Sequence, residues 1–232
     1  MNILALETSM GACGAAVLRG DGTSRRIVAH EERMARGHAE ALMPMVAEVM
    51  AEAGLDFAAL DLIAATVGPG SFTGVRIAIA AARGFALVTS AKHWSTDCLT
   101  VMARAALASG AMESSGKSFA VAVDARASMV YFGLYDGEGR KVEGPLLLGH
   151  DEAVALLPAG LQVAVGSGGA DLAAAALHRQ RQIDAKLPDL LPSAAVLAEL
   201  AFEAGETVPT LRPLYLRPPD AKPQAAAALA RR

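Results

Sequence analysis

The chain has 232 residues, enough for one large domain or two small lobes with an ample core. Apolar residues make up 53% of it and aromatic residues only 4%, because alanine supplies much of the apolar content. A formal net charge of −3 gives no bulk reason to expect independent nucleic-acid binding, so any role with RNA is expected to act through a partner protein. No apolar run is expected to reach the length of a bilayer span, and the N-terminus lacks a basic region ahead of an apolar one. The sequence therefore predicts a cytoplasmic protein without a membrane partner.

The pattern of residues 3–53 predicts three strands followed by a helix. Short apolar runs at residues 3–7, 13–18 and 25–31 are separated by polar or glycine-containing turns, which predicts a hairpin meander. Residues 38–53 then follow a helical period, and their apolar stripe consists of Leu42, Val46, Val49 and Ala53. Met43 and Met50 widen this stripe, either as core filler or as an adaptable protein-binding edge.

A glycine-rich connection follows the next strand. Residues 62–67 are a short apolar run, Gly68-Pro69-Gly70-Ser71 interrupts it, and a helix is predicted from about residue 73 to residue 88, capped by Ser71 or Thr73. One interpretation is a phosphate site at the helix N-terminus, with Arg76 as counter-charge; the other is a tight connection whose glycines serve packing. The sequence matches neither a Walker A loop nor a dinucleotide fingerprint. The candidate phosphate-loop residues are Gly68, Gly70, Ser71, Thr73, Gly74 and Arg76.

The second half repeats the order of the first in a weaker form. We expect helices at 96–108, 151–157, 170–177 and 194–204 and strands at 119–123, 130–135, 141–148 and 161–165. The strand at 119–123 ends in Asp124-Ala125-Arg126. The sequence thus predicts an N-terminal lobe (1–95), a C-terminal lobe (96–207) and a proline-rich tail (208–232). The tail is expected to dock through Leu211, Leu214, Tyr215 and Leu216, with Arg212 and Arg217 near the surface and its end frayed.

Four segments together carry a resemblance to a known family: ILALETS, GPGSFTGVRIAIAAARGFA, VAVDARASMVYFGLY and YLRPPDAK. In this order they resemble the TsaB (YeaZ) family of the bacterial threonylcarbamoyladenosine tRNA-modification system. The resemblance implies an α/β protein of the actin-like, sugar-kinase-like ATPase fold, with two ribonuclease-H-like lobes of which the second is reduced. It also implies a non-catalytic subunit that supports the catalytic paralogue TsaD, recruits the ATPase TsaE and forms a homodimer when alone. Such a complex modifies tRNAs that read ANN codons, so tRNA would be reached through the complex.

The sequence also contains few residues that could form a metal site or a catalytic site. A helical histidine pair with a carboxylate, as in iron or zinc sites, is not expected, because no two of the five histidines lie three to five positions apart. We therefore predict no metal site and no catalytic residue, and interpret each histidine as a surface or capping residue. Cys13 and Cys98 are expected to be buried reduced thiols. Glu7 ends the first strand where this fold commonly has an aspartate near Mg²⁺, which puts any inherited magnesium role in doubt.

The second glycine turn has two interpretations, a nucleotide-binding turn and a plain connection. Gly166-Ser167-Gly168-Gly169-Ala170 resembles the turn that lies under adenosine in this fold, but a plain strand-to-helix turn has the same composition. We expect no cofactor bound by this chain alone, with ATP or ADP possible in the complex.

The helices at 38–53 and 73–88 are the candidate partner interface, and the resemblance places both TsaD binding and self-association on them. Replacing Met50 or Val46 by an acidic residue is expected to abolish TsaD binding while leaving the fold cooperative. The alternatives are an active nucleotide hydrolase or small kinase, dependent on Glu7, and a peptidase with Ser71 as nucleophile. The peptidase lacks a neighbouring His–Asp pair and a nucleophile elbow. The predicted interface residues are Leu42, Met43, Val46, Met50, Ile77, Ala81 and Phe85.

Overall fold

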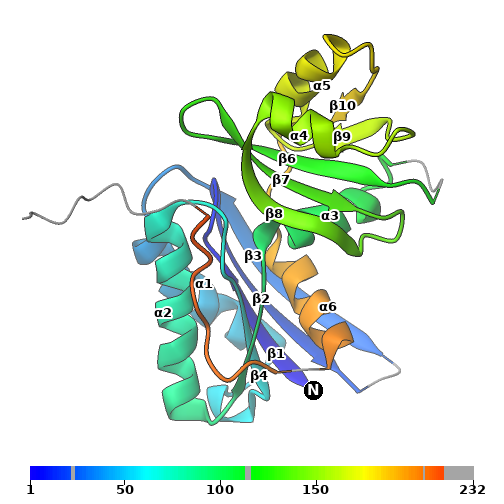
Figure 1. Ribbon diagram of the computed structural model, residues 1–232. Coiled ribbons are helices and arrows are strands. Elements are labelled where there is room, and N and C mark those ends of the chain that lie inside the picture. Colours follow the sequence, from blue (N-terminus) through cyan, green and yellow to red (C-terminus); the bar gives the residue numbers. More distant parts are fainter. Residues whose placement is uncertain (22–23, 113–115, 206, 217–232) are drawn as a thin grey trace, which may run out of the picture.

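The computed structural model describes residues 1–21, 24–112, 116–205 and 207–216. These residues form two lobes, each built on a mixed five-stranded sheet (Figure 1). The prediction that the end of the tail is frayed, and the placement of Arg217 at the surface, concern residues outside the described ranges.

The first lobe has its two most apolar strands at the centre of the sheet. The strand order is β3-β2-β1-β4-β5. β1, β2 and β3 are antiparallel, whereas β4 and β5 run parallel to β1. β1 and β4 are almost fully buried, as expected for strands covered on both faces. The strands are β1 (Asn2–Glu7), β2 (Ala12–Gly20), β3 (Arg25–Arg33), β4 (Leu62–Thr66) and β5 (Lys92–Thr96).

Helices cover both faces of this sheet. α1 (His38–Ala53) and α2 (Phe72–Thr89), with the short helix η1 (Phe57–Ala59), pack on one face. α6 (Ala194–Ala204) packs on the other face, against β1, β2, β3 and β4. The predicted boundary that placed residues up to 207 in the C-terminal lobe is therefore wrong for α6. The chain returns to the first lobe because the apolar face formed by residues such as Ile3, Leu18 and Leu62 must be covered.

The second lobe repeats the sheet of the first with smaller helices. Its strand order, β8-β7-β6-β9-β10, matches β3-β2-β1-β4-β5 position by position. α4 (His150–Leu156) and α5 (Gly169–Leu177) cover one face, and α3 (Cys98–Ala108) covers the other. α4 and α5 have 7 and 9 residues, against 16 and 18 in α1 and α2, which confirms a duplicated and reduced second lobe. The strands are β6 (Phe119–Ala125), β7 (Met129–Tyr135), β8 (Lys141–Gly149), β9 (Val163–Val165) and β10 (Asp184–Lys186).

The tail lies along the first lobe, as predicted. The Val208 backbone N–H donates to the His93 carbonyl at 2.8 Å, and the Leu214 N–H donates to the Val67 carbonyl at 2.7 Å. Leu211 is fully buried and Arg212 is exposed. These two backbone bonds, the buried Leu211 and the hydrogen bonds that Arg76 and Arg83 donate to the tail hold residues 208–216 in place.

One apolar helix is longer than the sequence analysis expected. Within the described ranges, α2 is long and apolar enough to cross a membrane by length and composition, with a mean hydropathy of 1.4 over 18 residues. This is weak support for a membrane span, because a core helix passes the same test. α2 contributes Val75, Ala78, Ile79 and Ala82 to the first-lobe core, so its apolar character has a packing explanation.

Candidate functional site

A cleft of about 1100 Å³ lies between the lobes, and both glycine turns reach it. On the first lobe it is lined by residues 9–11, which join β1 to β2, and by residues 69–73, which join β4 to α2. On the second lobe it is lined by the end of β6 and by Ser167, and the tail adds residues 214–216. The structure thus brings together segments that are far apart in the sequence.

The first glycine turn is pressed against the turn after β1. The Ser71 backbone N–H donates to the Ser9 carbonyl at 2.7 Å, and Thr8 Oγ1 donates to the Gly74 carbonyl at 2.7 Å. A Cβ at Gly70 would lie 2.2 Å from the Ser9 oxygen, and one at Gly74 would lie 2.0 Å from the Thr8 oxygen. Glycine is required at both positions because the two backbones approach so closely.

The N-terminus of α2 is capped from within the chain. Ser71, not Thr73, is the N-cap residue, and its Oγ accepts a hydrogen bond from the Gly74 N–H at 3.3 Å. The Val75 N–H donates to the Ser71 carbonyl at 3.0 Å. A phosphate cradle needs N–H groups that point freely at the ligand. The N–H groups of Ser71, Gly74 and Val75 are already bonded, which leaves only those of Phe72 and Thr73 at this helix end to face the cleft.

Arg76 is held by the tail. Its guanidinium carbon lies 3.6 Å from the centroid of the Phe72 ring, and its Nε donates to the Tyr215 hydroxyl at 2.7 Å. Of the candidate loop residues, Gly70, Ser71, Thr73 and Arg76 line the cleft, whereas Gly68 and Gly74 are packed against neighbouring chain.

Glu7 is sealed inside the first lobe. It is 1% exposed, and its Oε1 accepts hydrogen bonds from the Ser9 N–H at 2.6 Å and from the Ser9 hydroxyl. Burial raises the pKa of Glu7 to about 7, and the hydrogen bonds from Ser9 offset this only in part. The described residues that line the cleft do not include Glu7. This carboxylate does not face a ligand in the cleft.

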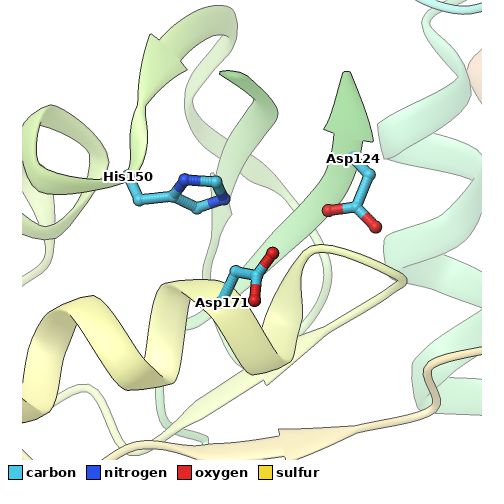
Figure 2. A group of neighbouring side chains, drawn as sticks. All are labelled: Asp124, His150 and Asp171. Carbon is cyan, nitrogen blue, oxygen red and sulfur yellow. The ribbon is translucent and has the colours of Figure 1, made fainter. Parts of the chain in front are cut away.

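A second group of ionisable side chains lies in the second lobe and was missed in the sequence. Asp124 near the end of β6, His150 at the start of α4 and Asp171 in the first turn of α5 each offer a ligand atom, and these atoms lie within 4.8 Å of one another (Figure 2). Histidine spacing along the sequence does not reveal this group, because its members come from three separate elements. The available signal was an aspartate ending a strand beside a glycine turn.

Most of the predicted interface residues on α1 are not on the surface. Leu42, Val46 and Met50 are 1%, 1% and 2% exposed, because they pack into the first-lobe core. That part of the predicted interface is wrong for the chain on its own, and an acidic residue at Val46 or Met50 would disrupt the core. Met43 is 44% exposed. On α2, Ile77, Ala81 and Phe85 are half-buried against the same core.

Both predicted thiols are buried and free, and burial raises the pKa of Cys13 to about 11. The Cys98 thiol donates to the Pro69 carbonyl at 2.6 Å, which helps to fix the first glycine turn. These cysteines are structural and unreactive.

Two lobes of the same mixed-sheet topology around a cleft define a protein of the actin-like ATPase fold with a reduced second lobe. The family model described as TsaD, tRNA N6-adenosine threonylcarbamoyltransferase, matches residues 29–188. The chain is 32% identical to the Escherichia coli (strain K12) tRNA threonylcarbamoyladenosine biosynthesis protein TsaB, over 94% of this chain and 95% of that protein. YeaZ from Pseudomonas aeruginosa is similar in structure, with a TM-score of 0.78, 32% identity and coverage of 93% of this chain and 100% of that one. The chain belongs to the TsaB (YeaZ) family.

Another Pseudomonas aeruginosa structure, described as an uncharacterized protein with similarity to peptidase YeaZ, also aligns with a TM-score of 0.78. It has 33% identity and covers 93% of this chain and 99% of that one. The geometry gives no support to a peptidase here. Ser71 Oγ caps α2, and the cleft-lining residues that the structure describes include no histidine to act as a base.

Proposed function

We propose that this chain is a non-catalytic subunit that binds and supports a TsaD-like catalytic paralogue in forming threonylcarbamoyladenosine in tRNAs that read ANN codons. The observation that carries the proposal is that the end of the first strand is closed off from the cleft. Glu7 is buried away from the cleft, and the glycine turn that would face a phosphate is bonded to the Ser9 backbone. Membership of the TsaB family indicates the tRNA modification in which the chain takes part. The buried Glu7 and the bonded glycine turn support the proposal that the chain does not catalyse a reaction on its own.

The helical layer of the first lobe is the surface proposed to bind the paralogue. Apart from Phe72, which lines the cleft, its exposed large apolar side chains are Met43, Phe57, Leu87 and Val88, which we call the α1–α2 surface; their exposed fractions are 44%, 36%, 87% and 80%. Leu87 and Val88 are neighbours near the end of α2, and adjacent large apolar side chains exposed to this degree favour a partner-binding role. The same surface would serve a homodimer when the paralogue is absent, so the two associations would compete.

The further partners, the compartment and the nucleotide in this proposal are taken from what membership of the TsaB family implies. A TsaE-like ATPase would join the complex, tRNA would be bound through it, and the assembly would work in the cytoplasm. Bound ATP or ADP would belong to the assembled complex.

Co-purification with the TsaD-like paralogue tests the α1–α2 surface. Leu87→Asp and Val88→Asp should each weaken recovery of the complex at least tenfold, because a carboxylate would be buried without a partner. Leu177→Asp is the matched control, since Leu177 is 68% exposed on α5 in the second lobe and should bind normally. Equal recovery of all three variants would contradict the placement.

Reconstitution tests the function itself. Threonylcarbamoyladenosine should form on tRNA when this chain is added to the TsaD-like and TsaE-like proteins and should fall to background without it. Full modification in the absence of this chain would rule out the supporting role.

A nucleotide hydrolase is the second candidate, because both glycine turns reach one cleft of about 1100 Å³. It predicts ATP turnover by the purified chain alone. Isothermal titration with ATP or ADP is the direct measurement, and the absence of heat at high nucleotide concentration would dispose of this candidate.

A further inference from the structure

Three elements of the second lobe direct potential metal ligands at one point. Asp124 comes from β6, His150 from the start of α4 and Asp171 from the first turn of α5. Figure 2 shows the imidazole ring between the α4 backbone and the two carboxylates, with all three side chains turned toward one another. Their ligand atoms lie within 4.8 Å of one another.

His150 has a ring nitrogen without a partner. Nε2 is buried and makes no hydrogen bond, although a buried polar atom is normally bonded. His150 as a whole is half-buried at the start of α4. An unbonded imidazole nitrogen beside two carboxylates is what a metal-binding histidine presents.

The two carboxylates also lack a counter-charge. Among the residues that the structure describes, no lysine or arginine forms an ion pair with Asp124 or Asp171. A divalent cation would bring both carboxylates an opposite charge and give Nε2 a partner at the same time.

We propose that Asp124, His150 and Asp171 bind one divalent transition-metal cation, with Zn²⁺ or Mn²⁺ as the ligand class. A mixed imidazole and carboxylate set suits these ions, whereas Mg²⁺ and Ca²⁺ favour sites made of oxygen ligands only. Ligand atoms about 2.1 Å from one ion lie at most about 4.2 Å apart. Small rotations of the two exposed aspartates bring the atoms within that limit.

The second glycine turn positions one of the ligands. The Asp124 backbone N–H donates to Ser167 Oγ at 3.0 Å, and a Cβ at Gly168 would lie 3.1 Å from Asp124 Oδ1. Gly168 therefore leaves room for the carboxylate, and Ser167 fixes the end of β6. Asp124 and Ser167 also line the cleft between the lobes, so the ion would be reached from the cleft. Three protein ligands leave at least one coordination position for water or an oxygen ligand.

The experiment uses the full chain, without a histidine tag and treated with a chelator. Co²⁺ is titrated as a spectroscopic probe, and Zn²⁺ and Mn²⁺ are then titrated by calorimetry. We expect one ion per chain, visible Co²⁺ absorption bands, and at least tenfold tighter binding of Zn²⁺ than of Mg²⁺. His150→Ala and Asp171→Asn should each weaken binding at least tenfold.

Two matched controls separate this site from general surface binding. Asp151→Asn removes an exposed carboxylate next to His150, and His178→Ala removes an exposed histidine at the end of α5; both should bind as the unchanged chain does. If His150→Ala fails to fold, Asp171→Asn still tests the site, because Asp171 is exposed. Absence of one-to-one binding, or equal affinity in Asp171→Asn, would overturn the proposal. The measurement needs no partner protein, so its outcome is independent of the supporting role proposed above.

Discussion

Gly70 and Gly74 have a packing role that their place in a glycine-rich turn does not reveal. Composition predicted the turn, and it left both phosphate binding and close packing open, with packing favoured. The distances show that these glycines have a packing role, because any side chain at either position would overlap the backbone of Thr8 or Ser9. Which segment lies against a turn depends on the tertiary fold, and no local pattern records it.

Gly74→Ala should destabilise the chain by about 1–3 kcal/mol, because its Cβ would meet a backbone oxygen that cannot move freely. Gly84→Ala is the control in the same helix, since nothing lies within 4 Å of its Cβ position. That variant should gain about 0.5–1 kcal/mol, because alanine favours a helix over glycine. Urea unfolding measures both changes. A Gly74→Ala variant as stable as the unchanged chain would contradict the close packing described here.

Glu7 gives a stability that depends on pH. Its pKa is about 7 in the folded chain and 4.5 when the side chain is exposed to water, so the unfolded chain releases this proton at lower pH than the folded chain does. The free energy of unfolding should therefore fall by about 3 kcal/mol as pH rises from about 4.5 to 7, and this contribution should stay constant above that.

Glu7→Gln removes this contribution and keeps an oxygen to accept the bonds from Ser9. The variant should equal the unchanged chain near pH 4.5 and be more stable by about 3 kcal/mol above pH 7. Urea unfolding at a series of pH values measures the difference. A gap that does not grow with pH would show that Glu7 is ionised without cost in the folded chain.

α1 illustrates what an element's pattern can and cannot predict. Its bounds, residues 38–53, follow from the apolar stripe and are confirmed. The stripe shows which side is buried, but the same pattern fits burial by the chain's own sheet and burial by a partner. The structure assigns Leu42, Val46 and Met50 to the sheet side. The sequence did not predict β5 and β10, because these two edge strands are short and largely polar and therefore show no apolar pattern.

The two sides of α1 should respond differently to the same substitution. Val46→Asp should lose several kcal/mol and cooperative unfolding, because an unpaired carboxylate would enter the core. Met43→Asp should remain folded, since Met43 is 44% exposed. Near-ultraviolet circular dichroism and thermal melting measure both variants. Cooperative melting of Val46→Asp at the usual temperature would place Val46 outside the core.

At the scale of the molecule, the duplicated architecture was predictable from element order, and the return of α6 to the first lobe was not. Both lobes repeat three antiparallel strands followed by two parallel ones, so the weak second half could be recognised by its order. Helix 194–204 was assigned to the lobe that precedes it in sequence. Only the uncovered face of the first sheet, seen in three dimensions, shows where it packs.

Residues 1–95 should not fold on their own, because the face that includes Ile3, Ala16, Leu18 and Leu62 would lose its cover from α6. Expressed as a fragment, they should aggregate or show no cooperative urea transition, whereas the full chain should unfold cooperatively. A soluble fragment with a sharp transition would restore the boundary predicted from sequence.

The path of α6 has a mechanical consequence. The polypeptide passes from one lobe to the other between β5 and β6 and comes back between β10 and α6. Two covalent links define an axis, so opening of the cleft amounts to a rotation about the line that joins them, and sliding of one lobe past the other is opposed at both ends. The places where the chain crosses therefore limit how the lobes can move relative to each other when a ligand enters the cleft.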